Sequence, residues 1–321
     1  MRKLIGAALA GAFLLSGPGA LAEQSGAVQL SGSLGPFARQ QANVAVPAYH
    51  VTFITQQQAT AVGSIEARAR LNAVLAGIDE TTMRRLTNEA YADLITRLQA
   101  ANLSVVPAAQ ARALANGVEA VPNNGDARGV GAGITIGRSV RRGYASYGAD
   151  EAPMLVPYHN PTGPTGGPNM MQAMGAANTI GRAAREIDAW AVIPALTIDF
   201  INMDARRTSS TANVSGEMLF SLRAASGAST AGRGNAGPGY MQGLRMTRDV
   251  TWDDAFAQVV QGGAAVREGS MVPIINENYQ VEARARGDAI VADVAVWEGL
   301  VRQAYQAFNT ALVAEIVEAR S

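Results

Sequence analysis

The alternation of apolar and polar residues predicts strands in two regions of the chain. Near the amino terminus, residues 49–55 are rich in β-branched and aromatic side chains and follow Pro47, which predicts a strand. Farther on, three runs of period two cover residues 195–203, 214–224 and 243–252. Because period two places one face of a strand on a core and the other toward water, these runs predict an antiparallel meander.

Helices and a short strand are predicted between these two regions. Residues 64–78 carry apolar side chains at helical spacing, and a second helix is expected after a cap at Thr87 or Asn88. Residues 103–106 then predict a short strand, and residues near 108–115 a short helix. Strand, helix and strand at this spacing indicate helices layered on a sheet.

The last helix is the longest predicted element. Apolar residues recur every three or four positions from Ile290 to Ile316, which predicts an amphipathic helix of about seven turns. Trp297, Tyr305 and Phe308 lie on its apolar stripe. We expect the stripe to pack on the sheet, and the alternative is that it is offered to a partner or to a second copy.

Less regular segments separate these elements. Residues 157–176 contain four prolines and four glycines, which predicts a long exposed loop of the kind that often carries function. Residues 225–239 are rich in Gly, Ser and Ala and predict a mobile hairpin tip. Residues 131–136 predict a further strand, and Asp253 is expected to cap another helix.

The amino terminus is typical of a secretory signal. Arg2 and Lys3 precede an apolar run, and the small residues of Ala20-Leu21-Ala22 predict cleavage after Ala22. Residues 23–45 predict a flexible leader because they are rich in Gln, Ser, Gly and Ala. The remainder, residues 46–321, is expected to form one domain.

Composition narrows the class of protein. The chain contains no cysteine, which excludes disulfides and thiolate metal sites. Its 26 basic and 26 acidic side chains balance, which argues against a partner that is a nucleic acid. After the signal no second apolar run reaches the length of a transmembrane helix, so we expect none in the mature chain and leave peripheral membrane contact open.

The order of these elements predicts the fold class. We expect an α/β (α+β) fold with a mixed sheet that contains the antiparallel meander, flanking helices and a long carboxy-terminal amphipathic helix.

The titratable residues offer little for catalysis. The chain has two histidines, His50 on the strand face opposite Tyr49, and His159 in the loop rich in Pro and Gly. Neither stands at a metal-ligand spacing, so we predict no metal, no cofactor and no catalytic residue. Asp199 and Asp249 are expected to pair with Arg223 or Arg245 on a solvated sheet face.

The candidate interaction residues lie in three places. The densest basic cluster is expected in a solvated loop, with contact to a partner as the alternative, and it consists of Arg138, Arg141 and Arg142. Tyr158 and His159 belong to the long loop. The aromatic residues of the last helix complete the set: Trp297, Tyr305 and Phe308.

The element order resembles a known group of envelope proteins. The strand at 51–55, the helix that includes residues 88–95, the strand at 103–106 and the meander follow the order found in the periplasmic α/β domains of the curli-secretion lipoprotein CsgG and in the amino-terminal domain of TolB. The resemblance covers roughly residues 47–255 and implies a non-enzymatic role. The chain departs from CsgG because it has no cysteine to lipidate.

These observations favour an exported bacterial envelope protein, periplasmic, secreted or on the cell surface, with a non-enzymatic role in assembly or interaction. Its expected partner is an envelope protein or further copies of itself. Two alternatives stay open, a periplasmic hydrolase that uses His159 and a small-ligand-binding protein that uses residues 157–176.

Overall fold

The computed structural model describes residues 26–34, 37–62, 68–135, 138–159, 170–207, 212–232, 243–260, 274–275, 281–282 and 288–320. The predicted signal at residues 1–22 lies outside this part of the chain, and so do residues 160–169 of the loop predicted at 157–176 and residues 233–239 of the loop predicted at 225–239.

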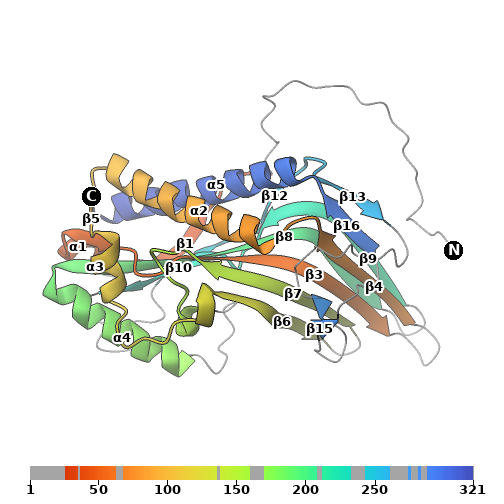
Figure 1. Ribbon diagram of the computed structural model, residues 1–321, viewed down its shortest axis with the longest axis horizontal. Coiled ribbons are helices and arrows are strands. Elements are labelled where there is room, and N and C mark those ends of the chain that lie inside the picture. The colour runs from red at the N-terminus through yellow and green to blue at the C-terminus, as the bar shows by residue number, and fades with distance from the viewer. Residues whose placement is uncertain are drawn as a thin grey trace, which may run out of the picture.

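A mixed, mostly antiparallel sheet with helices on both faces forms the body of the protein (Figure 1), which confirms the predicted α+β class. Its main path, in order across the sheet, is β1 (Leu30–Ser33), β11 (Gly243–Met246), β10 (Gly227–Ala231), β8 (Ala189–Arg207), β3 (His50–Val62), β4 (Arg68–Ala76), β16 (Asp288–Ala292) and β13 (Ala257–Val260). Strands that branch from this path are β2 (Asn43–Ala45), β5 (Ser104–Val105), β6 (Gly125–Thr135), β7 (Arg138–Gly148), β9 (Ala212–Leu222) and β12 (Val250–Trp252). A separate two-stranded sheet pairs β14 (Ile274–Ile275) with β15 (Val281–Glu282).

Helices cover the two faces of this sheet separately (Figure 1). α2 (Glu80–Ala100) and α5 (Val294–Arg320) lie together on one face, whereas α4 (Met170–Glu186) packs on β8 and β10 from the other. α1 (Phe37–Gln40) contacts α5, and α3 (Ala108–Ala113) adds Ala111 to the core beneath α4. The two sides are called the α2/α5 face and the α4 face below.

Each face has its own core. The larger core lies on the α2/α5 face, and its bulkiest buried side chains are Tyr49, Phe53, Trp190, Phe200, Phe220, Trp252, Trp297 and Phe308. The buried core under α4 is aliphatic and rich in alanine, and it includes Ala177, Ile180, Ala184, Ala189, Ala191 and Ile193.

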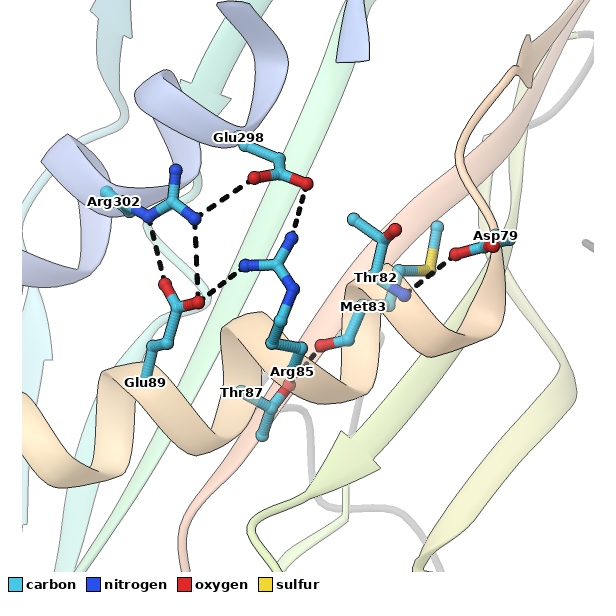
Figure 2. Close-up of polar contacts among 8 residues, drawn as sticks. All are labelled: Asp79, Thr82, Met83, Arg85, Thr87, Glu89, Glu298 and Arg302. Atoms are coloured by element: carbon cyan, nitrogen blue, oxygen red, sulfur yellow. Dashed lines mark hydrogen bonds and ion pairs between the residues drawn. The ribbon is translucent and has the colours of Figure 1, made fainter. Parts of the chain in front are cut away.

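α2 begins earlier in the chain than the sequence predicted. Its cap is Asp79, whose side chain accepts a hydrogen bond of 2.7 Å from the backbone N–H of Thr82 (Figure 2). Thr87, predicted as the cap, is buried inside the helix, where its hydroxyl donates to the carbonyl of Met83 at 2.9 Å. A threonine within a helix can satisfy its hydroxyl in this way, so the residue type alone did not mark the helix start.

Four charged side chains join α2 to α5 (Figure 2). Arg302 donates to Glu89 at 2.9 Å and to Glu298 at 3.0 Å, and Arg85 donates to both carboxylates. Although burial raises the pKa of Glu89, its hydrogen bonds with Arg302 and Arg85 lower that pKa below the usual value. These side chains are partly exposed, so the network mainly sets how the two helices align and adds little free energy per pair.

A buried amide joins the same two helices to the sheet. Asn309 of α5 donates to the carbonyl of Ala90 and to the carboxylate of Asp93, both at 2.9 Å, and accepts from the hydroxyl of Tyr49 at 3.3 Å. Because Asn309 is fully buried, each of these bonds prevents an unsatisfied polar group in the core.

The predicted last helix is confirmed as α5, which begins at Val294, while Ile290 belongs to β16. The meander is confirmed in its first two runs, which form the antiparallel pair β8–β9. Its third run is divided into β11, which pairs with β10, and β12, which pairs with β9.

Two predicted helices were wrong. Residues 68–76 form the strand β4, in which Val74 and Leu75 on opposite faces are both buried. A strand buried on both faces lacks period two and is easily mistaken for a helix. After Asp253 the chain forms β13 instead of a helix, because it pairs with β16.

Segments predicted to be flexible contain paired structure. Within the predicted leader, β1 pairs with β11 and β2 pairs with β5 and β8. Within the loop predicted at 225–239, β10 lies between β8 and β11, where a Cβ on Gly227 would stand 2.4 Å from the carbonyl oxygen of Leu244. The small residues that predicted mobility here permit close approach of backbones. Residues 170–176 of the loop predicted at 157–176 belong instead to α4, which begins at Met170.

We expect Phe308→Ala to lower the free energy of unfolding by about 3–5 kcal/mol, because it leaves a cavity in the larger core, where Phe308 is 0% exposed. Val317→Ala on the same helix, where the side chain is 40% exposed, should change it by less than about 0.5 kcal/mol. Urea unfolding followed by circular dichroism measures both, and equal effects would contradict the assigned face of α5.

Candidate functional site

The sheet divides at the middle of β3. Over its first residues β3 runs parallel to β8, and that pairing ends at Phe53 opposite Ile198. From Gln56 onward β4 takes the place of β8 beside β3, while β8 continues in an antiparallel pair with β9. β3 also has a bulge between Ile54 and Gln56, where its register with β7 shifts. Two strands that were hydrogen-bonded neighbours therefore separate, and polar side chains occupy the point where they do.

Gln57 connects the strands that separate. Its amide nitrogen lies 2.7 and 2.6 Å from the two carboxylate oxygens of Asp199 and 2.7 Å from the carbonyl oxygen of Ile201. Asp199 also accepts a hydrogen bond of 2.9 Å from the backbone N–H of Phe200. The side chain of Gln57 thus replaces the backbone bonds that β3 no longer makes with β8.

Two arginines, one on β7 and one directly after β9, lie beside the Asp199 carboxylate. Arg142 of β7, which lies opposite Gln57 in the register, approaches it to 3.6 Å, and Arg223 approaches it to 3.9 Å. Arg223 also pairs with Asp249 at 3.0 Å. This group of Gln57, Arg142, Asp199, Arg223 and Asp249 is called the polar junction.

Burial dominates the titration of the polar junction. It raises the pKa of the Asp199 carboxyl, and Arg223 and Arg142 oppose that rise. Burial likewise lowers the pKa of the Arg142 guanidinium, and Asp199 opposes that fall. Asp199 is 1% exposed, so the prediction of a solvated sheet face was wrong, although the predicted partner Arg223 was right.

The two histidines meet on the same side of the sheet. On β8 the side chains of Ala191 and Ile193 lie on the α4 face, and the alternation of the strand places Ala195 and Asp199 on that face too. His50 pairs with Ala195 in the parallel register, so it also lies on the α4 face. The His50 and His159 rings lie 5.9 Å apart at 80°. The ring of Tyr144 lies 5.7 Å from that of His159 at 71°. These three residues are called the histidine corner.

His50 and Tyr158 each have a buried polar atom without a hydrogen-bond partner among the described residues. His50 is 2% exposed, and its Nδ1 has no hydrogen-bond partner in the described part of the chain. Burial, reinforced by the charge of His159, lowers the pKa of His50 to about 3. The hydroxyl of Tyr158 is buried without a hydrogen-bond partner among the described residues, and burial raises its pKa.

The candidate interaction residues have different positions from those the sequence predicted. The basic cluster lies on the strand β7 and not in a loop: Arg138 pairs with Ala61, Arg141 with Gln58 and Arg142 with Gln57. β7 was missed because its arginines and glycines hide the apolar alternation, which is restricted to the segment near Tyr144.

The aromatic residues of the last helix are not on a surface. Trp297, Tyr305 and Phe308 are 1%, 5% and 0% exposed and pack in the larger core. Their assignment as interaction residues was therefore wrong for this chain by itself, and the expected packing of the stripe on the sheet is what the structure has.

Sequence reasoning missed the central residues of the junction. Gln57 lies just beyond the predicted strand, in the run Gln56-Gln57-Gln58, where all three side chains are buried. Three consecutive glutamines normally indicate a segment that is exposed to solvent. The signal that could have identified them is that the run continues directly from a strongly apolar strand.

No family model, curated protein or solved structure matches this chain. The predicted resemblance to CsgG and TolB therefore stays a prediction. Within the described residues, no helix combines the length and the apolar character needed to cross a membrane. The hydrolase and ligand-binding alternatives also stay predictions.

Acid should destabilise the fold through His50. Its pKa falls from about 6.5 in the unfolded chain to about 3 in the folded one, so the unfolded state binds more protons between these values. The stability contributed by neutral His50 is complete above about pH 6.5 and is lost as the pH falls toward 3, by on the order of a few kcal/mol. Thermal unfolding between pH 7.5 and 5 measures this loss.

The His50→Phe variant is the control, and its stability should be nearly flat from pH 7.5 to 5. Glu89 and Asp79, whose pKa values are lowered, lose their contributions only nearer to pH 4. The raised pKa of Asp199 acts in the opposite direction, because its protonation favours the folded state. An equal decline in wild type and variant would assign the acid sensitivity to another group.

Asp199→Ala should destabilise the fold by about 3–5 kcal/mol, because it removes the acceptor of the Gln57 amide and of the Phe200 N–H and leaves Arg142 and Arg223 partly buried without their partner. Asp204→Ala on the same strand removes the partner of Arg206. That pair is exposed, with Arg206 83% accessible, so its loss should cost less than about 1 kcal/mol. Denaturant unfolding at pH 7.5 compares the two variants, and a loss for Asp199→Ala no larger than that for Asp204→Ala would contradict the role given to the junction.

Proposed function

We propose that this chain is an exported bacterial envelope protein with a non-enzymatic role in assembly, and that copies of it join through the outer edge of β6. The observation that carries the proposal is that this edge of β6 pairs with no strand in the described part of the chain. The signal-like residues 1–22 and the predicted resemblance of the element order to that of CsgG support export and an envelope role.

β6 is an outer strand of the sheet (Figure 1). It pairs with β7, and no other strand of the described chain is hydrogen-bonded to it. From Gly129, opposite Tyr144, to Thr135, opposite Arg138, the pairing with β7 is regular. A regular outer strand presents a row of backbone N–H and C=O groups that a further strand can pair with.

This part of β6 lacks the features that usually block strand addition. Natural edges carry charged side chains, proline or a bulge. Residues 129–135 read Gly-Val-Gly-Ala-Gly-Ile-Thr, without charge or proline. The register irregularity of β6 lies before them, between Asp126 and Gly129. The segment is therefore suited to pairing with another chain.

The chain itself offers a complementary edge. β9 pairs with β12 only through Phe220, Ser221 and Leu222. The preceding residues of β9, from Ala212 to Met218, have β8 on one side and no other paired strand in the described structure. Pairing of β6 in one copy with β9 in the next joins different surfaces head to tail, which produces a ring or a filament.

Proline at two adjacent positions of β6 tests this assembly. Neighbouring N–H groups on a strand point to opposite edges, so Val130→Pro and Gly131→Pro remove one outward and one inward hydrogen-bond donor. We expect wild-type oligomers in native mass spectrometry. One variant should be monomeric with an unchanged melting temperature, and the other should melt at a lower temperature because its bond to β7 is lost.

Val259→Pro is the matched control and should leave the oligomers intact, because Val259 lies on β13, the last strand of the main sheet path, and its side chain is 49% exposed. A wild-type chain that stays monomeric at high concentration, or oligomers that survive both β6 variants, would contradict the proposal. Recovery of the mature chain in the cytoplasmic fraction of a Gram-negative host would contradict export.

A further inference from the structure

The histidine corner brings together residues from three separate parts of the chain. His50 begins β3, Tyr144 lies on β7, and His159 follows the short 3-10 turn Val156–Tyr158. The backbone N–H of His159 donates to the carbonyls of Leu155 and Val156, at 3.1 and 3.2 Å. This holds the residue at the end of the turn, beside the sheet, even though its neighbours after residue 159 belong to a segment rich in Pro and Gly.

The buried ring of His50 has a nitrogen that is available to an external ligand. An imidazole buried to 2% exposure would normally have both nitrogens satisfied, yet its Nδ1 has no hydrogen-bond partner among the described residues. A neutral imidazole with an available lone pair is the form that binds transition metals.

We propose that His50 and His159 bind one late first-row divalent ion, Zn²⁺ or Cu²⁺, close to the ring of Tyr144, which contacts His159. Imidazole nitrogen is a preferred ligand of both ions. Two metal–nitrogen bonds of about 2.0–2.1 Å, together with the ring radii, place two ligand ring centres roughly 5 to 6.5 Å apart as the nitrogen–metal–nitrogen angle opens from tetrahedral to linear, and the 5.9 Å between the His50 and His159 ring centres lies within that range. The steep 80° angle between the rings sets no obstacle, because two ligand rings need not be coplanar.

The number of protein ligands limits the kind of site. Across the described residues, no group of three His, Cys, Asp or Glu side chains could hold a metal. The site is therefore built on two nitrogens, and its remaining coordination positions are left for water or for an external ligand. His159 is partly buried as a residue, but both of its ring nitrogens are buried, so an ion held by the two imidazoles would be shielded from bulk water on their side. Cu²⁺ should bind more tightly than Zn²⁺, in the usual order for nitrogen ligands.

The composition makes the test unusually clean. These are the only histidines and the chain has no cysteine, so the double variant His50→Phe/His159→Phe removes every imidazole and adds no other ligand. The chain is expressed without a histidine tag and titrated with ZnSO₄ and CuSO₄ by isothermal calorimetry at pH 7.5. Electron paramagnetic resonance of the Cu²⁺ form reports the coordinated nitrogens.

We expect one ion per chain, two imidazole nitrogens in the resonance spectrum, and at least a tenfold loss of affinity in each single variant. In the double variant the stoichiometric event should disappear. An unchanged one-to-one event in the double variant, or no binding by the wild type to either ion, would overturn the proposal and leave the corner as aromatic packing only.

Folding of the variants is checked by circular dichroism and thermal unfolding. If His50→Phe fails to fold, His159→Phe still carries the test, because that side chain is only partly buried. Tyr144→Phe keeps both imidazoles and the ring contact with His159, and it should retain two-nitrogen binding. The result is independent of the proposed assembly, because binding can be measured on the monomeric β6 variant.

Discussion

The carboxylate of Asp199 is the constraint on which the arrangement of the sheet depends. It lies where β3 leaves β8, at 1% exposure, and a buried charge of this kind is tolerated only with close polar partners. Gln57 must come from β3, Arg142 from β7 and Arg223 from the end of β9. Each of these strands is thereby held in one register, since a shift by one residue would turn its polar side chain to the opposite face.

The same constraint explains why the two faces of the sheet differ. On the α2/α5 face, the side chains that precede the junction are large and apolar, such as Phe53 of β3, which lies 5.7 Å from the ring of Trp297. On the α4 face the corresponding positions are polar, and Thr52 and Ser146 share a hydrogen bond of 2.7 Å. The histidine corner continues this polar series toward α4, so its position follows from the register that the junction sets.

The sequence predicted an element correctly where a single hydrophobic periodicity ran through it without interruption. α5 has a continuous apolar stripe, and β8 has a long alternation, so both were found. β4 was taken for a helix because Val74 and Leu75 are both buried, and β10 was taken for a loop because its small residues serve close packing between strands. The polar junction could not be predicted, because the buried state of Gln57 depends on Asp199, which is 142 residues away.

The two proposed sites are linked through β7. Tyr144 pairs with Gly129, the first residue of the regular part of β6, and its ring contacts His159 on the α4 face. An ion at the histidine corner would therefore sit one strand from the edge through which copies are proposed to join. If the ion changed the order of β7, it would change the affinity between copies, and assembly would then change the affinity for the ion by the same factor. If instead the junction already holds β7 rigidly through Arg142, the two events are independent.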